Sequence, residues 1–167
     1  MKIVLIGSAC CYKTSAGKLI AEKLNCKHID LDEQIEQTAN KSISDIFALY
    51  GEAEFRNLER HALLAVADCE NAVISCGGGT VTCSDFERFA RGSLVVWLKA
   101  NAHTVVSRLG GIPRPLYDGK SVLDIDKLIN ARTPYYEKYA NLIVNTDGLT
   151  SNQVADLVLR QINEHKC

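Results

Sequence analysis

The sequence has little of what would mark a membrane, secreted or nucleic-acid-binding protein. It contains 3 prolines in 167 residues, and no apolar run approaches the ~18 residues that a membrane-spanning helix needs. Nothing resembles a secretory leader, because the apolar stretch after Met1 is short and continues into a glycine loop. The formal net charge of −1 does not indicate a polyanionic partner. We therefore expect no membrane and no nucleic-acid partner.

The cysteines and histidines form no recognisable framework. The 7 cysteines are odd in number and lack C-x-x-C spacing, which argues against a disulfide scaffold and against a zinc site. The 4 histidines form no cluster and are expected on the surface. Because free thiols persist in reducing compartments, we expect a cytoplasmic protein.

Short apolar segments alternate with amphipathic ones along the chain. A length of 167 residues allows one domain that buries ~70% of its unfolded surface. The alternation predicts an α/β sandwich with a parallel sheet and a ligand site at the carboxyl ends of the strands. The expected strands lie at residues 2–6, 27–30, 72–75, 94–98 and 142–145.

Glycine and proline give the expected boundaries of three segments. Gly51 is expected to end a helix over 44–50, and a second helix would follow over 52–69. Residues 123–138 are expected to be helical despite Pro134, which is expected to start a new helix near Tyr135. Residues 110–120 (GGIPRPLYDGK) hold two prolines and three glycines, which predicts a mobile loop.

The residues after the first strand have the spacing of a phosphate-binding loop. Gly7 is followed six residues later by Lys13 and Thr14, as in G-x-x-x-x-G-K-[ST]. In this motif backbone N–H groups cradle phosphates, the lysine reaches the β/γ-phosphates, and the hydroxyl ligates Mg²⁺. The alternative is a strand-to-helix turn with a chance Lys-Thr. Because a strand precedes the loop and a helix follows it, we expect ATP and Mg²⁺ here, with Ser15 among the ATP-binding residues.

Tyr12 stands where the motif has its second glycine. That position commonly has a positive φ, which costs a residue other than glycine ~1–2 kcal/mol. The phenol could also occupy the space of the phosphates or force the loop open. The loop would then bind ATP weakly or no longer support catalysis. Alternatively, Tyr12 points away from the phosphates.

Cys10 and Cys11 belong to the same loop and are expected among the ATP-binding residues with Tyr12. At a helix N-terminus beside Lys13, a thiol could have a lowered pKa and be oxidisable. The alternative is that both are small buried residues in place of glycine or serine.

Charged residues near the ends of other elements complete the candidate site. Asp30 and Asp32 follow a strand, and paired carboxylates beside a magnesium phosphate site can hold the metal and orient or deprotonate a hydroxyl. A solvated helix start is the alternative explanation. Paired N–H groups of arginine suit an anionic substrate, although each arginine alone also fits a surface position. The candidates are Arg56, Arg114 and Arg132.

Several motifs together resemble one family of kinases. From Lys2 to about Asn145 the chain is similar to shikimate kinase in its phosphate-binding loop and in D-L-D, SISDIFALYGEAEFRNLE, ISCGGGT, RPLY and ARTPYYEKYA. The resemblance implies a three-layer P-loop kinase fold of the nucleoside-monophosphate-kinase type, with a five-stranded parallel sheet flanked by helices. It further implies ATP-dependent phosphorylation of the 3-hydroxyl of shikimate, in aromatic amino-acid biosynthesis. A monomer is expected.

For the acceptor, the resemblance implies that Asp32 binds the ring hydroxyls and acts as base or orienter. Arg56 and Arg132 would clamp the shikimate carboxylate. Gly78 and Gly79 would offer backbone donors, although a tight turn explains these glycines equally well. Other side chains would line or brace the pocket, namely Phe47, Phe55 and Glu59.

For the nucleotide, the resemblance implies that Thr14 is an inner-shell ligand of Mg²⁺ and that Asp30 binds the ion through water. Arg114 would swing towards the transferring phosphoryl group within a lid over about 110–120, and Arg108 would lie beside adenine. The expected catalytic residues are Lys13, Asp32 and Arg114. Lys13, Mg²⁺ and Arg114 would neutralise charge on the phosphoryl oxygens, while the lid excludes water.

Two other functions remain open. A binding protein of the same fold could recognise shikimate but lack productive nucleotide binding, since the acceptor residues are intact and the loop is altered. The second alternative is a related small-molecule kinase, such as one acting on gluconate. It is disfavoured because the acceptor positions Asp32, Arg56 and Arg132 all fit shikimate.

Overall fold

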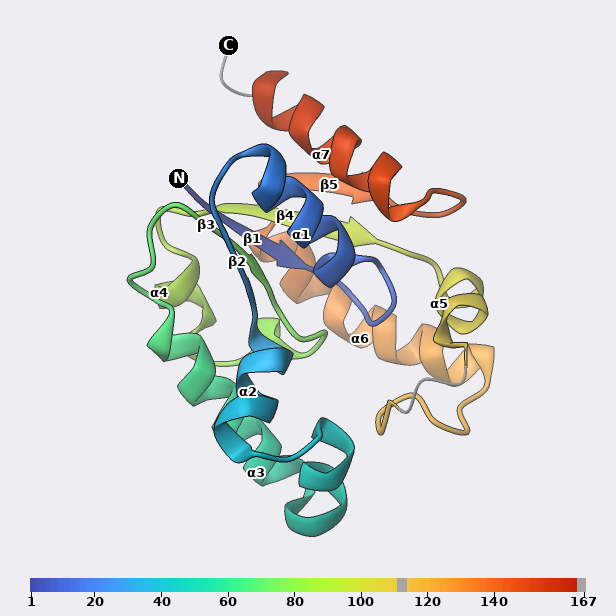
Figure 1. Cartoon of the computed structure of the whole chain (residues 1–167). Helices are drawn as coiled ribbons and strands as arrows, with labels where there is room; N and C mark the ends of the chain where they lie inside the picture. Colours follow the sequence, from blue (N-terminus) through green and yellow to red (C-terminus); the bar gives the residue numbers. More distant parts are fainter. Residues whose placement is uncertain (111–113, 165–167) are drawn as a thin grey trace.

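Five parallel strands form a single sheet in the part of the chain that the computed structural model describes, residues 1–110 and 114–164 (Figure 1). Their order across the sheet is β2-β3-β1-β4-β5. This confirms the expected α/β class and the five-stranded parallel sheet. The strands are β1 (Lys2–Ile6), β2 (Lys27–Asp30), β3 (Ala72–Ser75), β4 (Leu94–Lys99) and β5 (Leu142–Asn145).

Helices cover both faces of the sheet and so make a three-layer sandwich (Figure 1). Helices α1 and α7 pack together on one face, and α4 with the C-terminal parts of α3 and α6 covers the other. None of the described helices is long and apolar enough to cross a membrane. The helices are α1 (Lys13–Lys23), α2 (Leu31–Ala39), α3 (Ile43–Ala65), α4 (Phe86–Ala90), α5 (Ala102–Leu109), α6 (Val122–Tyr139) and α7 (Ser151–Glu164).

The central strand β1 is a nearly continuous apolar run because both of its faces are buried. Ile3 and Leu5 belong to the core under α1 and α7, whereas Val4 and Ile6 belong to the core under α3 and α4. Because successive side chains of a strand point to opposite faces and both faces are covered, every position from Ile3 to Ile6 is apolar and buried.

The strand order places three functional segments at one edge of the sheet. The phosphate-binding loop follows β1, Asp30 ends β2, and Gly77 follows β3. Since β3 pairs with both β1 and β2 in parallel register, the carboxyl ends of these strands lie next to one another. A ligand site is expected at such an edge.

One expected helix boundary is confirmed and two differ from the structure. Gly51 separates two helical stretches as expected, because the range of α3 (Ile43–Ala65) is interrupted there by a non-helical residue whose φ of 80° and ψ of 177° suit glycine alone. The second stretch ends at Ala65, short of the expected Cys69. Pro134 does not start a new helix, because α6 continues through it to Tyr139. Pro134 lies on the exposed side, where water can satisfy the carbonyl that lacks its N–H partner.

The expected lid falls partly outside the described residues, which omit 111–113. From Arg114 onward the segment forms a hydrogen-bonded turn. The Arg114 carbonyl accepts from the N–H of Tyr117 (2.7 Å) and of Asp118 (2.9 Å), and the Asp118 carboxylate accepts from the N–H of Arg114 (2.9 Å). The sequence also predicts a closing amphipathic helix over 151–165, and residue 165 lies outside the described residues.

Candidate active site

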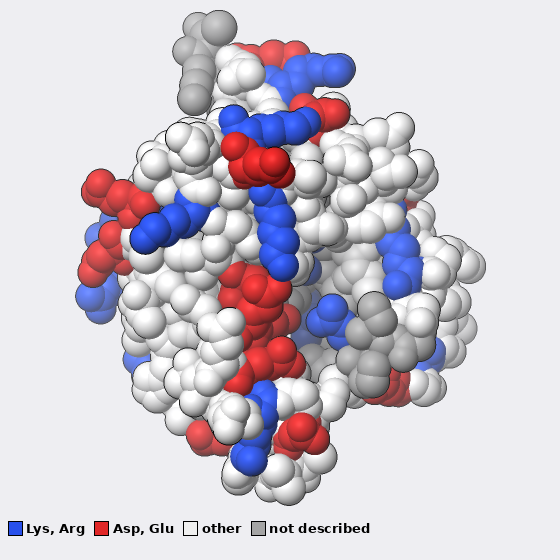
Figure 2. All heavy atoms as spheres, viewed as in Figure 1, with Lys and Arg blue, Asp and Glu red and all other residues white. Residues whose placement is uncertain are grey.

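A cavity of ≈ 430 Å³ opens at the carboxyl edge of β1, β2 and β3. Figure 2 shows its mouth as a hollow with acidic atoms along one margin and basic atoms facing them. All but one of the residues expected to bind ligands line this cavity; the exception is Cys11. The lining includes Cys10, Tyr12, Lys13, Thr14, Ser15, Asp30, Asp32, Arg56, Gly78, Gly79, Arg108, Arg114 and Arg132.

The phosphate-binding loop curls around the ammonium of its own lysine. Lys13 is the first residue of α1, and its Nζ donates to the Ser8 carbonyl at 2.5 Å. The loop begins at Gly7, where φ is 141° and a Cβ atom would lie 2.2 Å from the Leu98 carbonyl oxygen, so only glycine fits. The ammonium is therefore held at the N-terminus of α1, where anionic phosphate is favoured.

Tyr12 has the left-handed backbone that the motif predicts, with φ 68° and ψ 18°. Its ring lies 4.1 Å from the guanidinium carbon of Arg108. A cation–π contact stabilises by ~0.5–2 kcal/mol, depending on how far it is shielded from water. The contact is therefore comparable in size to the ~1–2 kcal/mol cost of a left-handed residue with a side chain.

Cys10 and Cys11 fit the structural interpretation better than the redox one. Cys11 is fully buried in the core under α1, and its thiol donates to the Ser8 carbonyl at 2.9 Å. Burial raises the pKa of Cys10, and the opposing charges of Arg114 and Lys13 do not reverse the direction. A lowered thiol pKa, which the redox interpretation requires, is thus not found at Cys10. The Cys11 side chain does not line the cavity, so the expected contact of Cys11 with ATP, through its backbone N–H, stays a prediction.

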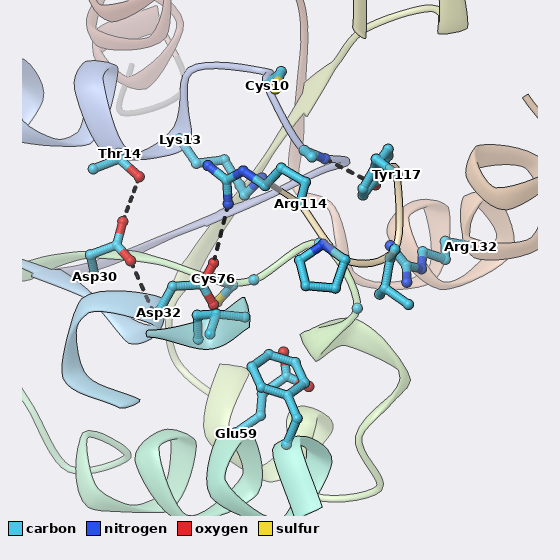
Figure 3. Close-up of a pocket in the computed structure, with 18 of the residues that line it drawn as sticks. Cys10, Lys13, Thr14, Asp30, Asp32, Glu59, Cys76, Arg114, Tyr117 and Arg132 are labelled. Carbon is cyan, nitrogen blue, oxygen red and sulfur yellow. Dashed lines mark hydrogen bonds and ion pairs between the residues drawn. The ribbon is translucent and has the colours of Figure 1, made fainter. Parts of the chain in front are cut away.

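Thr14 and Asp30 form the pair that suits a magnesium ion. Thr14 Oγ1 donates to Asp30 Oδ2 at 2.5 Å, while Asp30 Oδ1 caps α2 by accepting from the N–H of Asp32 (3.0 Å) and of Glu33 (3.2 Å). The capping bonds fix the carboxylate, as Figure 3 shows. Mg²⁺ takes one or two protein oxygens and completes its shell with phosphate and water, so this donor set fits it.

Asp32 carries a buried oxygen that has no partner within the described residues. Oδ1 is the unpaired atom, and Oδ2 lies 4.0 Å from Arg114 Nη1 (Figure 3). Burial is the main cause that raises the pKa of Asp32 from 3.8 to about 6, with the charges of Asp30 and Glu59 acting in the same direction. Lys13 and Arg114 lower it. An unpaired acceptor with a raised pKa is suited to bind a hydroxyl and take its proton.

Arg56 is held in place by acidic residues of its own helix. Its Nη1 donates to Glu59 Oε2 at 2.7 Å, and its Nη2 donates to Glu52 at 3.2 Å. Glu59 is buried, and its other oxygen accepts from Thr80 Oγ1 at 2.7 Å. The guanidinium also packs on Gly79, where a Cβ would lie 2.5 Å from Nη1. The placement of Glu59 agrees with its expected bracing role.

Arg132 approaches the same glycine segment from α6. It is buried, and a Cβ on Gly78 would lie 3.3 Å from its Nη1. Tyr136, one turn further along α6, donates its hydroxyl to the Gly78 carbonyl at 2.6 Å. The glycines therefore lie between two guanidinium groups, and their missing side chains leave the room that both need.

Comparison with known proteins agrees with the resemblance seen in the sequence. A sequence model described as shikimate kinase matches residues 9–163. The chain belongs to the shikimate kinase family. The expected family and kinase class are thereby confirmed.

Individual relatives agree with the family match over nearly the whole chain. The shikimate kinase of Moorella thermoacetica is 38% identical over 164 residues, which cover 97% of this chain and 92% of that protein. The shikimate kinase of Xylella fastidiosa is 37% identical over 168 residues, covering 98% and 92%.

Solved structures of shikimate kinases share the fold. The enzyme from Acinetobacter baumannii in complex with shikimate superposes with a TM-score of 0.94 at 27% identity, covering 99% of this chain and 94% of that one. The enzyme from Bacteroides thetaiotaomicron gives a TM-score of 0.84 at 34% identity, covering 98% of each chain.

Two site contacts were not expected from the sequence. The Tyr117 hydroxyl accepts from the N–H of Ala9 at 3.2 Å, so the RPLY segment of this shikimate kinase family member touches the phosphate-binding loop (Figure 3). His28 was expected on the surface but is half-buried, with Nε2 2.9 Å from Ser75 Oγ. Ser75 in turn donates to the Lys13 carbonyl at 2.8 Å. RPLY was the available signal for Tyr117; none existed for His28.

Proposed function

We propose that this chain transfers the γ-phosphoryl group of ATP to the 3-hydroxyl of shikimate, as its family does. The observation that supports this most directly is the unpaired Oδ1 of Asp32, in a cavity that also holds Lys13 on one side and Arg56 and Arg132 on the other. The same cavity thus contains a carboxylate that can accept a hydrogen bond from a hydroxyl, a lysine that can bind phosphate, and two guanidinium groups that can bind a carboxylate.

The acceptor side of the proposed reaction uses the three residues expected from the resemblance. Arg56 and Arg132 bind the carboxylate of shikimate, since guanidinium N–H groups match carboxylate oxygens in pairs. Asp32 accepts a hydrogen bond from the reacting hydroxyl. With a pKa of about 6, Asp32 is ionised at neutral pH and can receive the hydroxyl proton as the new phosphate ester forms.

The donor side is formed by the phosphate-binding loop and the turn that begins at Arg114. Lys13 leaves the Ser8 carbonyl to contact the β/γ-phosphates, and Arg114 approaches the oxygens of the transferring group. Thr14 and Asp30 would hold Mg²⁺, which supplies positive charge between the phosphates when it is bound. Phosphoryl transfer depends mainly on positioning and charge neutralisation, which these groups provide.

The proposal includes a lid over about 110–120 that closes on the bound substrates. Exclusion of water would prevent transfer of the phosphoryl group to water instead of shikimate. The described part of this segment, from Arg114 to Tyr117, already contacts Asp32 and the N–H of Ala9. We further propose a single domain over residues 1–167, a monomer, and a cytoplasmic location in aromatic amino-acid biosynthesis.

The test is coupled ADP release with MgATP and either shikimate or gluconate as acceptor. We expect saturable turnover with shikimate and background rates with gluconate. Turnover with gluconate alone would show a different small-molecule kinase. Calorimetric binding of shikimate without any turnover would instead favour the non-catalytic binding protein, and absence of both would refute the proposal.

A further inference from the structure

We propose that Tyr12 is a positioning residue, whose ring holds Arg108 so that Arg108 fixes the phosphate-binding loop for the phosphates of ATP. This inference rests on the proposed function, because it concerns how the same loop receives its nucleotide. The motif has glycine at this position, and in the structure the larger side chain of Tyr12 packs on the guanidinium of Arg108.

Arg108 connects two loops that are far apart in the sequence. Its Nη1 donates to the Cys10 carbonyl at 3.2 Å and to Thr146 Oγ1 at 3.0 Å. Its Nη2 donates to the Thr146 carbonyl at 2.5 Å and to the Leu149 carbonyl at 3.4 Å. The guanidinium therefore fastens the phosphate-binding loop to the loop that follows β5.

The ring of Tyr12 covers one face of this guanidinium. The distance of 4.1 Å between the ring centroid and the guanidinium carbon leaves no space for water between them. Arginine keeps its planar group in place best when hydrogen bonds hold its edge and an aromatic ring holds its face. Tyr12 thus restricts movement of the guanidinium out of the plane in which its hydrogen bonds lie.

The bond to the Cys10 carbonyl sets the direction of a loop amide. In a trans peptide the N–H points opposite to the carbonyl, so the N–H of Cys11 points away from Arg108. Backbone N–H groups of this loop bind phosphate in the motif. A loop whose peptide planes are already set loses less conformational freedom when the nucleotide binds.

Replacing Tyr12 by glycine therefore has two opposite effects. Glycine adopts a positive φ without strain, so the variant does not lose stability on that account. It also removes the ring from Arg108 and frees the loop, so the affinity for nucleotide falls. If Tyr12 only filled space, its replacement by glycine would not lower the affinity for nucleotide while leaving the stability of the protein unharmed.

The experiment measures calorimetric binding of MgADP and of magnesium tripolyphosphate to the full chain and to Tyr12→Gly. We expect both ligands to bind about tenfold more weakly to the variant. We expect the melting temperature to stay equal or rise, and KM for ATP to increase while KM for shikimate is unchanged. Because the binding measurement needs no turnover, its result does not depend on whether shikimate is the acceptor.

Three further variants serve as controls. Tyr12→Phe keeps the ring and should recover most of the ADP affinity, whereas Tyr50→Leu removes an exposed tyrosine of α3 and should have no effect. Arg108→Lys should weaken ADP binding, and its combination with Tyr12→Gly should add little, because both remove the same tether.

Three results would overturn the proposal. Equal or tighter ADP binding by Tyr12→Gly would show that the ring obstructs the loop. A loss for ADP but not for tripolyphosphate would show that Tyr12 acts on the nucleoside and not on the phosphate-binding loop. Additive effects of the Tyr12 and Arg108 substitutions would show that the two residues act independently.

Discussion

The two halves of the cavity are held in place by different means. The acceptor half lies on regular elements, where Arg56 and Glu59 share helix α3 and Arg132 lies on α6. The nucleotide half is formed by the loop before α1 and by the turn that begins at Arg114, and contacts between Tyr12 and Arg108 and between Ala9 and Tyr117 fix that loop. Charge pairing on helices thus fixes the acceptor site, whereas aromatic side chains fix the loop that binds phosphate.

The largest effect is expected from Lys13→Met, which removes charge from the nucleotide half alone. Loss of the ammonium should reduce kcat by about 1,000-fold, since the transferring phosphoryl oxygens lose a fixed positive charge. Calorimetric affinity for shikimate, measured at pH 8 where Asp32 stays ionised, should change less than about twofold. A large loss of shikimate affinity would show that the two halves are not independent.

Asp32→Asn should reduce kcat by about 100-fold or more, because amide nitrogen cannot accept the hydroxyl proton. The wild-type rate should also fall with protonation of Asp32 as the pH drops through about 6. The measurement is a pH–rate profile of both proteins. A profile that is flat between pH 5 and 8 would contradict a role of Asp32 as base.

The same variant should melt at a higher temperature than the wild type at pH 7.5. The pKa of Asp32 is raised from 3.8 to about 6 in the folded protein, so the folded state binds the proton more tightly than the unfolded chain. Stability therefore falls as the pH rises from about 4 to 6, and the loss persists above pH 6. Asparagine avoids this loss, and its advantage should vanish below pH 3.8. Thermal unfolding across pH checks both statements.

Glu59→Gln tests whether charge pairing fixes the acceptor half. Arg56 loses its buried ionic partner, so KM for shikimate should rise about tenfold and the free energy of unfolding should fall by about 2 kcal/mol. The matched control is Glu87→Gln, which breaks an exposed pair with Lys138 and should change neither quantity measurably. Unchanged kinetics in Glu59→Gln would show that Arg56 does not need this brace.

Tyr117→Phe should have the smallest effect, a rise of about threefold in KM for ATP with no change for shikimate, because one neutral hydrogen bond to the N–H of Ala9 is lost. Tyr135→Phe on the exposed side of α6 is the control. A lower KM for ATP in Tyr117→Phe would reverse the comparison, since the tyrosine would then compete with phosphate for the Ala9 amide.

The strands and the motif residues could be predicted from the sequence because their signals are local. β1 is a continuous apolar run that ends in Gly7, and Lys13 and Thr14 follow at a fixed spacing. The new helix predicted at Pro134 is wrong, because the cost of a proline within a helix depends on whether water can reach the carbonyl that it leaves unpaired.

Contacts between distant segments could not be predicted in this way. The stack of Tyr12 on Arg108 joins residues of the phosphate-binding loop and α5, and the pairing of His28 with Ser75 joins neighbouring strands. Nothing in the spacing of either pair marks it. In the sequence, Tyr12 is only a departure from the motif. Its proposed role depends on Arg108, which lies beside it in space but far away in the sequence.

The kink of α3 at Gly51 divides the acceptor pocket into two walls of different adaptability. Phe47 precedes the kink, while Phe55 and Arg56 follow it, and the two phenyl rings meet across it with centroids 4.7 Å apart. Rotation at one glycine would move the apolar wall and leave the charged wall in register with the sheet. With shikimate bound as proposed, such a rotation would change the apolar contacts of its ring while Arg56, which follows the kink, keeps its place beside the glycine loop.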